Sequence, residues 1–114
     1  MTDDSIYINV SEGSKRVMNN TKLYSKLLDK FKADQSLSEI KTALAEGDMI
    51  KAKTSAHALK GLTANLSLTE LYNQCVELEN QIKAGAVKDE QLNLFYDVYD
   101  KTLVEIDKVI NQYA

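Results

Sequence analysis

The residues best suited to chemistry in this sequence gather around its one histidine, His57. Lys53 precedes it by four residues, Lys60 follows it by three, and Gly61 follows it by four. Residues three or four apart are neighbours on the surface of a helix. On a helix, the imidazole would therefore lie between two cations, beside a turn with almost no side-chain bulk.

This arrangement suits the transfer of a phosphoryl group through the histidine. Imidazole has a reference pKa of about 6.5, so its neutral, nucleophilic form is available at pH 7. A phosphoryl group attached to the ring carries about two negative charges, which neighbouring cations offset. Lys60 is a point charge on a flexible stem that can follow the phosphate. Lys53 is a weaker second cation or simply a solvated surface lysine.

Helix stability does not explain why position 61 is a glycine. A glycine inside a helix costs about 1 kcal/mol relative to alanine, and a solvent-facing glycine gains no core packing to offset that cost. Gly61 is therefore a tolerated defect, the site of a helix kink, or the clearance that a large partner needs to reach the imidazole. We favour clearance.

Helical periodicity predicts which way His57 points. At about 100° per residue, the small and apolar residues between Ala52 and Leu66 form one stripe centred on Leu59. His57 lies about 160° away from Leu59 on the same count. The imidazole is thus expected to face solvent rather than the core.

Composition limits the remaining possibilities. A chain of 114 residues suits a single domain over 1–114, and four glycines without any proline argue against a β-rich fold. With 14 basic and 17 acidic residues, a net charge of −3 argues against nucleic-acid binding by electrostatics. The lone cysteine, Cys75, cannot form an internal disulfide, and no apolar run approaches the ~20 residues of a membrane span. We expect a cytoplasmic protein without a membrane segment.

Apolar spacings of three, four and seven, separated by capping residues, predict an all-α protein. The expected helices cover about 11–18, 21–46, 49–66, 68–84 and 88–111. Asp34 to Ser36 interrupts the second pattern, where Ser36 and Glu39 suit a capping box, but we predict one continuous helix with a weak point there. Short connections make successive helices antiparallel. The prediction is an up-down-up-down antiparallel four-helix bundle with a short extra N-terminal helix.

Two stretches resemble one known family. Ala56 to Leu66, AHALKGLTANL, resembles the phosphorylation motif A-H-x-L-K-G-x-x-x-N-L of histidine-containing phosphotransfer (HPt) domains. Leu71 to Glu79 is similar to the L-x-x-x-C-x-x-L-E run on the following helix of that family, and parts of 10–31 resemble its opening helices. The resemblance spans essentially the whole chain. It departs at Ser67, where many members have glycine, although serine serves well as a helix N-cap.

Carried over residue by residue, the resemblance implies roles for four residues. His57 would accept the phosphoryl group through Nε2, Lys60 would stabilise the phosphate, and Gly61 would give clearance. Glu79 matches a position at which some members have a polar residue that accepts a hydrogen bond from the histidine Nδ1. The alternative for Glu79 is a plain solvated glutamate.

The resemblance implies a phosphoryl carrier that has no ATP site. Such a carrier would not be an enzyme in its own right. It would accept a phosphoryl group from the aspartyl phosphate of a receiver domain and pass it to another receiver. The partners would be response-regulator receiver domains, including one of a hybrid histidine kinase, and Mg²⁺ would belong to the receiver, leaving this chain without a cofactor. Docking is expected around Ile50, Lys53 and Ala64, on a monomer.

Two other functions compete with the carrier. A helical scaffold that binds partners without carrying phosphate shares the predicted fold and stays open. A ferritin-like metal bundle needs paired Glu-x-x-His motifs from two helices, which a chain with one histidine cannot supply.

Overall fold

The computed structural model describes residues 6–113; positions 1–5 and 114 of the predicted domain lie outside the described residues. Within 6–113 the chain is all-helical, as predicted, and has no strand. The helices are α1 (Val10–Lys15), α2 (Thr21–Phe31), α3 (Ser36–Glu46), α4 (Met49–Asn65), α5 (Thr69–Ala84) and α6 (Asp89–Tyr113).

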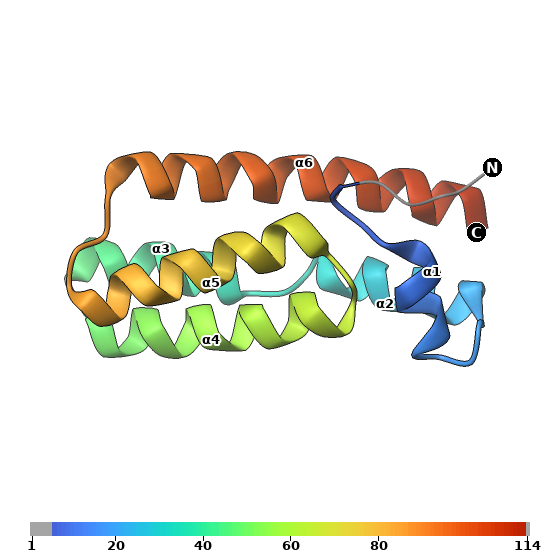
Figure 1. The fold of residues 1–114 in the computed structure, drawn as a ribbon, viewed down its shortest axis with the longest axis horizontal. Coiled ribbons are helices and arrows are strands. Elements are labelled where there is room, and N and C mark those ends of the chain that lie inside the picture. Colours follow the sequence, from blue (N-terminus) through green and yellow to red (C-terminus); the bar gives the residue numbers. More distant parts are fainter. Residues whose placement is uncertain (1–5, 114) are drawn as a thin grey trace.

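From α3 onward, each helix packs against the next one along the chain. α3 packs on α4, α4 on α5, and α5 on α6, while α2 packs on the far part of α6. Successive helices from α3 to α6 alternate in direction (Figure 1). The α3–α4 reversal is short because Gly47 adopts the left-handed conformation, with φ of 72°, and Asp48 then caps α4 through Lys51 N–H at 3.0 Å.

The prediction of one continuous helix over 21–46 was wrong. α2 ends at Phe31 and α3 begins at Ser36. In the break, the Asp34 carboxylate accepts a hydrogen bond from the Ser36 backbone N–H at 2.9 Å. Short polar side chains of this kind compete with the helical backbone for its own hydrogen-bonding groups. Glu39 makes no capping box; its Oε2 accepts a hydrogen bond from the Ser55 hydroxyl of α4 at 3.1 Å.

α4 buries the face that its periodicity predicted. Ala52, Ala56 and Leu59 are fully buried, and Ser55 and Thr63 are nearly so. Small residues on this face let the neighbouring helices approach closely, while burial of the stripe leaves the opposite face of α4 to solvent. The largest buried side chains around this stripe come from the other helices and the turns: Tyr24, Leu28, Phe31, Ile40, Leu68, Leu71, Leu78, Phe95 and Ile106.

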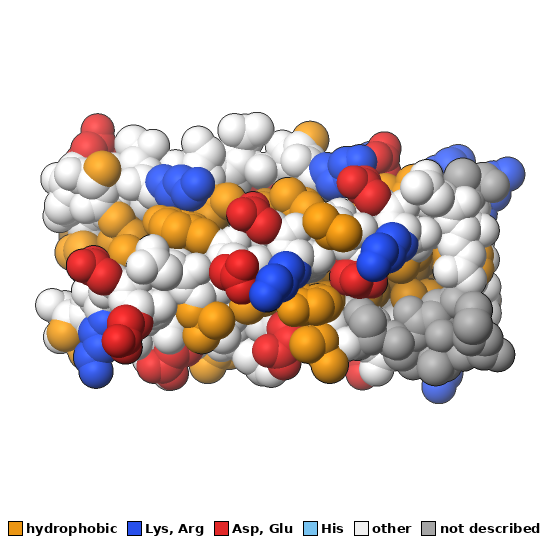
Figure 2. Space-filling view, turned by 90° about the horizontal axis from the view of Figure 1, so that it is seen from above, with side chains coloured by type: hydrophobic (Ala, Val, Ile, Leu, Met, Phe, Trp, Pro, Cys, Tyr) orange, Lys and Arg blue, Asp and Glu red, His pale blue; other side chains and the backbone are white. Residues whose placement is uncertain are grey.

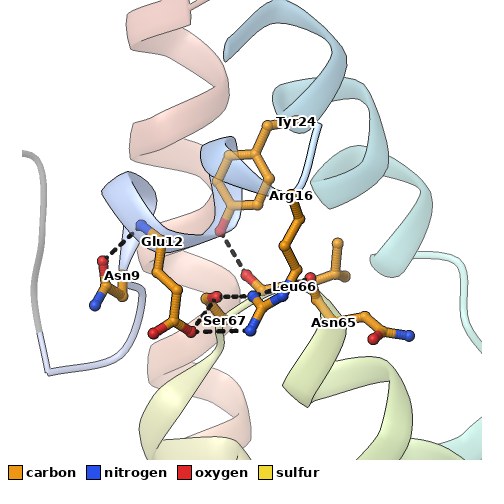
Figure 3. Close-up of polar contacts among 7 residues, drawn as sticks. All are labelled: Asn9, Glu12, Arg16, Tyr24, Asn65, Leu66 and Ser67. Carbon is orange, nitrogen blue, oxygen red and sulfur yellow. Dashed lines mark hydrogen bonds and ion pairs between the residues drawn. The ribbon is translucent and has the colours of Figure 1, made fainter. Parts of the chain in front are cut away.

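The turn between α4 and α5 is tied to α1 (Figure 3). Ser67 lies there in the left-handed conformation, with φ of 56°, and the N-cap of α5 is Leu68 rather than the predicted Ser67. The Ser67 hydroxyl donates to Glu12 Oε1 at 2.8 Å and accepts a hydrogen bond from Arg16. The serine therefore ties the α4–α5 turn to Arg16 and Glu12, which precede it in the chain by 51 and 55 residues.

Tyr24 of α2 also holds this turn. Its hydroxyl donates to the backbone oxygen of Leu66 at 2.5 Å (Figure 3), and its ring is fully buried. A Cβ on Gly13 would come within 2.4 Å of that ring, so α1 needs glycine to pack there. The N-terminal segment thus packs against the end of α4.

The face of the molecule formed by α6 has no large patch of one charge. Acidic and basic side chains alternate there with apolar ones (Figure 2). None of the helices within the described part of the chain is long and apolar enough to span a membrane.

Candidate functional site

His57 lies in the middle of α4 and points away from the core, as its register predicted. Its side chain is 69% exposed, whereas Leu59, two residues on, is fully buried. An imidazole in this position is reachable from outside. The ring is nevertheless held at one side by the neighbouring helix.

Glu79 of α5 provides that support. Its Oε2 lies 2.9 Å from His57 Nδ1, and its Oε1 lies 2.6 Å from Lys60 Nζ. The Glu79 side chain is only 3% exposed, so the solvated glutamate considered as an alternative does not describe it. One buried carboxylate therefore contacts both the histidine and the lysine of the motif.

The charge state of Glu79 decides which nitrogen of the His57 ring carries a proton and which does not. Burial raises the pKa of this carboxyl, but hydrogen bonds from Lys60 and His57, together with the positive charges of Lys60 and Lys83, outweigh burial, and the net pKa is lowered. An ionised carboxylate only accepts hydrogen bonds, so Nδ1 of His57 carries the proton that it donates. In the neutral ring, Nε2 then keeps the lone pair and is the nitrogen able to act as a nucleophile.

Lys60 is paired with Glu79. Its hydrogen bond to Glu79 is the largest cause of the raised pKa of the Lys60 ammonium. Its stem runs over the surface, with 26% of the side chain exposed. The lysine therefore stands beside the imidazole with its charge neutralised by a buried partner.

Gly61 lies on an open surface. A Cβ added there would meet no atom within 4 Å, in contrast to Gly13, where a Cβ would collide with Tyr24. Nothing within the described chain requires glycine at position 61, so the helix-propensity cost noted above has no internal compensation.

The residues expected to dock a partner lie on the surface of α4. Ile50 is 82% exposed, Lys53 is exposed and Ala64 is partly buried. Ile50 and Lys53 are accessible to a partner, and the docking role of all three residues stays a prediction.

Sequence reasoning missed two features of the site. Lys83 of α5, with Lys53, Thr54, His57 and Glu79, lines a surface hollow of about 340 Å³. The signal was present, because Lys83 follows Glu79 by four residues and must share its helix face.

The second feature lies below Lys60. Thr63 donates a hydrogen bond to the Lys60 backbone oxygen at 2.9 Å.

Burial raises the pKa of the neighbouring Cys75 thiol to about 12, which keeps the thiol protonated and unreactive. Within residues 6–113, no three His, Cys, Asp or Glu side chains cluster as a metal ion would require.

Glu79 should make the stability of the protein depend on pH. Because its pKa is below the ordinary value of 4.5, its ionised form is favoured in the folded state. The resulting stabilisation is present above pH 4.5 and is lost as the pH falls through the folded pKa. The difference in unfolding free energy between wild type and Glu79→Gln should therefore shrink on acidification, as measured by urea unfolding at a series of pH values. Glu77→Gln, exposed on the same helix, controls for loss of a charge; a Glu79 difference that stays constant down to pH 3 would contradict the argument.

Comparison with known proteins adds one finding. The family model described as Hpt domain matches residues 26–112, well over half of the chain. The match includes His57, Lys60, Gly61 and Glu79 and begins within α2, so the resemblance noted for the N-terminal part lies largely outside it. The comparisons with curated proteins and with solved structures give no significant match.

Proposed function

The chain belongs to the Hpt domain family, and from this premise we propose that it is a phosphorelay intermediate that carries a phosphoryl group on His57. Hpt domains act in two-component phosphorelays as phosphoryl carriers without kinase activity of their own. The observation that carries the proposal is the pairing of an exposed imidazole with a buried carboxylate at Nδ1, which leaves Nε2 free.

The proposed step is an in-line displacement at phosphorus. The lone pair of His57 Nε2 attacks the phosphorus of a receiver's aspartyl phosphate, and the bond between phosphorus and the acyl oxygen breaks. The aspartate leaves as a carboxylate with that electron pair. His57 keeps its Nδ1 proton, and the positive charge that develops on the ring is stabilised by Glu79 at 2.9 Å. The reverse step delivers the group to another receiver.

The other residues of the motif support this step in different ways. Lys60 contributes a cation beside the ring, and through Glu79 it also helps to fix the imidazole. Gly61 leaves room for the surface of the receiver domain that surrounds the receiver's aspartyl phosphate. Ile50 and Ala64 are proposed as apolar docking contacts.

The partners follow from the same proposal. They are response-regulator receiver domains, one of them in a hybrid histidine kinase, and each receiver supplies the Mg²⁺ for its own aspartate. We further propose a cytoplasmic monomer. In its fold, α2 and α3 together correspond to the first member of an up-down-up-down four-helix bundle completed by α4, α5 and α6.

Incubation with a phosphorylated receiver domain tests the proposal. The label should move to this chain and be labile in acid but stable in alkali, as a phosphorus–nitrogen bond requires. A receiver that binds the chain without transferring label, across the receivers of the same organism, would instead favour the scaffold alternative.

Lys60→Ala is expected to affect both transfer and stability. Transfer from the receiver should slow by about tenfold or more, because a charge-assisted contact beside the phosphate is lost. The melting temperature should also fall, because Oε1 of the buried Glu79 loses its partner. Rapid-quench transfer assays and thermal unfolding monitored by circular dichroism measure the two effects.

Lys51→Ala provides the matched control for Lys60→Ala, because Lys51 is an exposed lysine on the same helix and has no side-chain ion pair within residues 6–113. Its transfer rate and melting temperature should stay close to wild type. Equal behaviour of the two variants would remove Lys60 from the site.

A further inference from the structure

The hollow beside His57 has a chemical character that the motif does not explain. It lies between α4 and α5, has a volume of about 340 Å³, and is lined by Lys53, Thr54, His57, Glu79 and Lys83. Lys60, the cation of the motif, is not among its lining residues. Two further lysines therefore border a hollow that includes the proposed phosphoacceptor.

These two lysines reach the hollow from different helices. Lys53 precedes His57 by one helical turn on α4, and Lys83 follows Glu79 by one turn on α5. Both side chains are exposed, and neither forms an ion pair with any residue in 6–113. The main influences on the pKa of the Glu79 carboxyl are burial, the hydrogen bonds from Lys60 and His57, and the charge of Lys60. The positive charge of Lys83 is a smaller cause that also lowers this pKa.

Counting charges shows why such lysines are needed. Before transfer, the ionised Glu79 and the protonated Lys60 cancel one another at 2.6 Å, and the form of the imidazole that attacks the phosphorus is neutral. Transfer adds a phosphoryl group with about two negative charges, and the ring, protonated at Nδ1, contributes one positive charge. The phosphorylated site therefore carries about one uncompensated negative charge, and about two once the Nδ1 proton is lost. Lys60 can supply that compensation only by weakening its bond to a buried carboxylate.

We propose that Lys53 and Lys83 are the cations that balance the phosphoryl group on His57, and that the hollow between them is where its oxygens lie. This inference rests on the proposed function and deepens it. Lys60 then divides its charge between Glu79 and the phosphate, while Lys53 and Lys83 supply the remaining positive charge in the phosphorylated state. Both lysines have stems long and flexible enough to follow the phosphate.

A receiver-free experiment separates this role from partner docking. Phosphoramidate is a small donor that transfers its phosphoryl group to imidazole and releases ammonia, so it needs no protein interface. The full chain would be phosphorylated with it as wild type, Lys53→Gln, Lys83→Gln and the double variant, and the phosphoryl group titrated by phosphorus NMR. Lys51→Gln and Lys22→Gln, singly and together, match the change in net charge with exposed lysines that do not line the hollow.

Loss of nearby cations disfavours the doubly charged phosphoryl group. The second phosphoryl pKa should therefore rise by about 0.5 unit or more in the Lys53→Gln, Lys83→Gln double variant. The control double variant should shift it by less than half as much. Each single variant should give part of the rise.

Three other results would each overturn the inference. Equal titration in both double variants would show that the two lysines do not face the phosphoryl group. If in addition transfer from a receiver slowed only in the Lys53→Gln, Lys83→Gln protein, the lysines would belong to a docking surface for acidic side chains. If wild-type protein gained no phosphohistidine from either phosphoramidate or a phosphorylated receiver, the proposed function would fail, and this inference with it.

Discussion

A His57→Gln variant should take up no phosphoryl group from a phosphorylated receiver, and it should still fold. The loss should be complete, because the chain has no second histidine and the glutamine amide nitrogen has no available lone pair. Stability should change little, because the His57 side chain is 69% exposed. The glutamine NH₂ group can also donate to Glu79 Oε2 in place of Nδ1.

Two measurements on the His57→Gln protein make the result decisive. Transfer of label is followed by gel electrophoresis under alkaline conditions, and folding is followed by circular dichroism and melting temperature. A variant that unfolds would be replaced by His57→Asn, which keeps an amide donor on a shorter stem. Label on either folded variant would mean that another residue accepts the phosphoryl group.

Gly61→Leu is expected to reduce transfer from a receiver by about 100-fold while making the helix more stable. The added side chain meets nothing within this chain at its Cβ, and leucine has a higher helix propensity than glycine by most of 1 kcal/mol. Outside the chain, it would project one turn from His57 into the space that the receiver must enter. A displacement of about 1 Å at the reacting atoms is enough for a loss of this size.

Phosphoramidate again provides the control for Gly61→Leu. A small donor should phosphorylate His57 in the variant at nearly the wild-type rate, because it does not need the clearance. Gly61→Ala should fall between the two proteins with the receiver and match wild type with phosphoramidate. If Gly61→Leu slowed both donors equally, the leucine would be disturbing the imidazole itself, and clearance would not be the role of the glycine.

Helical periodicity was sufficient to predict the most important feature of the site. The direction of His57 follows from counting residues along one helix, because burial of the stripe around Leu59 fixes the rotation of α4. The cap at Asp48 and the left-handed Gly47 were predictable for a similar reason, since both depend on local backbone geometry.

Features that depend on side chains from distant segments were not predictable in this way. The resemblance pointed to Glu79, but only the packing of α5 on α4 buries its carboxylate and pairs it with Lys60 as well as His57. The sequence shows an interruption at Asp34, but the apolar spacing that continues across it predicts one helix. There the Asp34 carboxylate accepts a hydrogen bond from the Ser36 backbone N–H and so competes with the helical backbone.

The contacts around Ser67 bear on how large the cooperative folding unit is. Residues 26–112 match the Hpt family, yet the left-handed serine is held by Glu12 and Arg16, and the adjoining Leu66 carbonyl by Tyr24. All three partners precede residue 26, so a fragment trimmed to the matched stretch would lose every one of these anchors. The phosphoacceptor helix would then have a frayed end two turns beyond His57. Family boundaries therefore underestimate the length of chain that must fold together for the imidazole to be held rigidly.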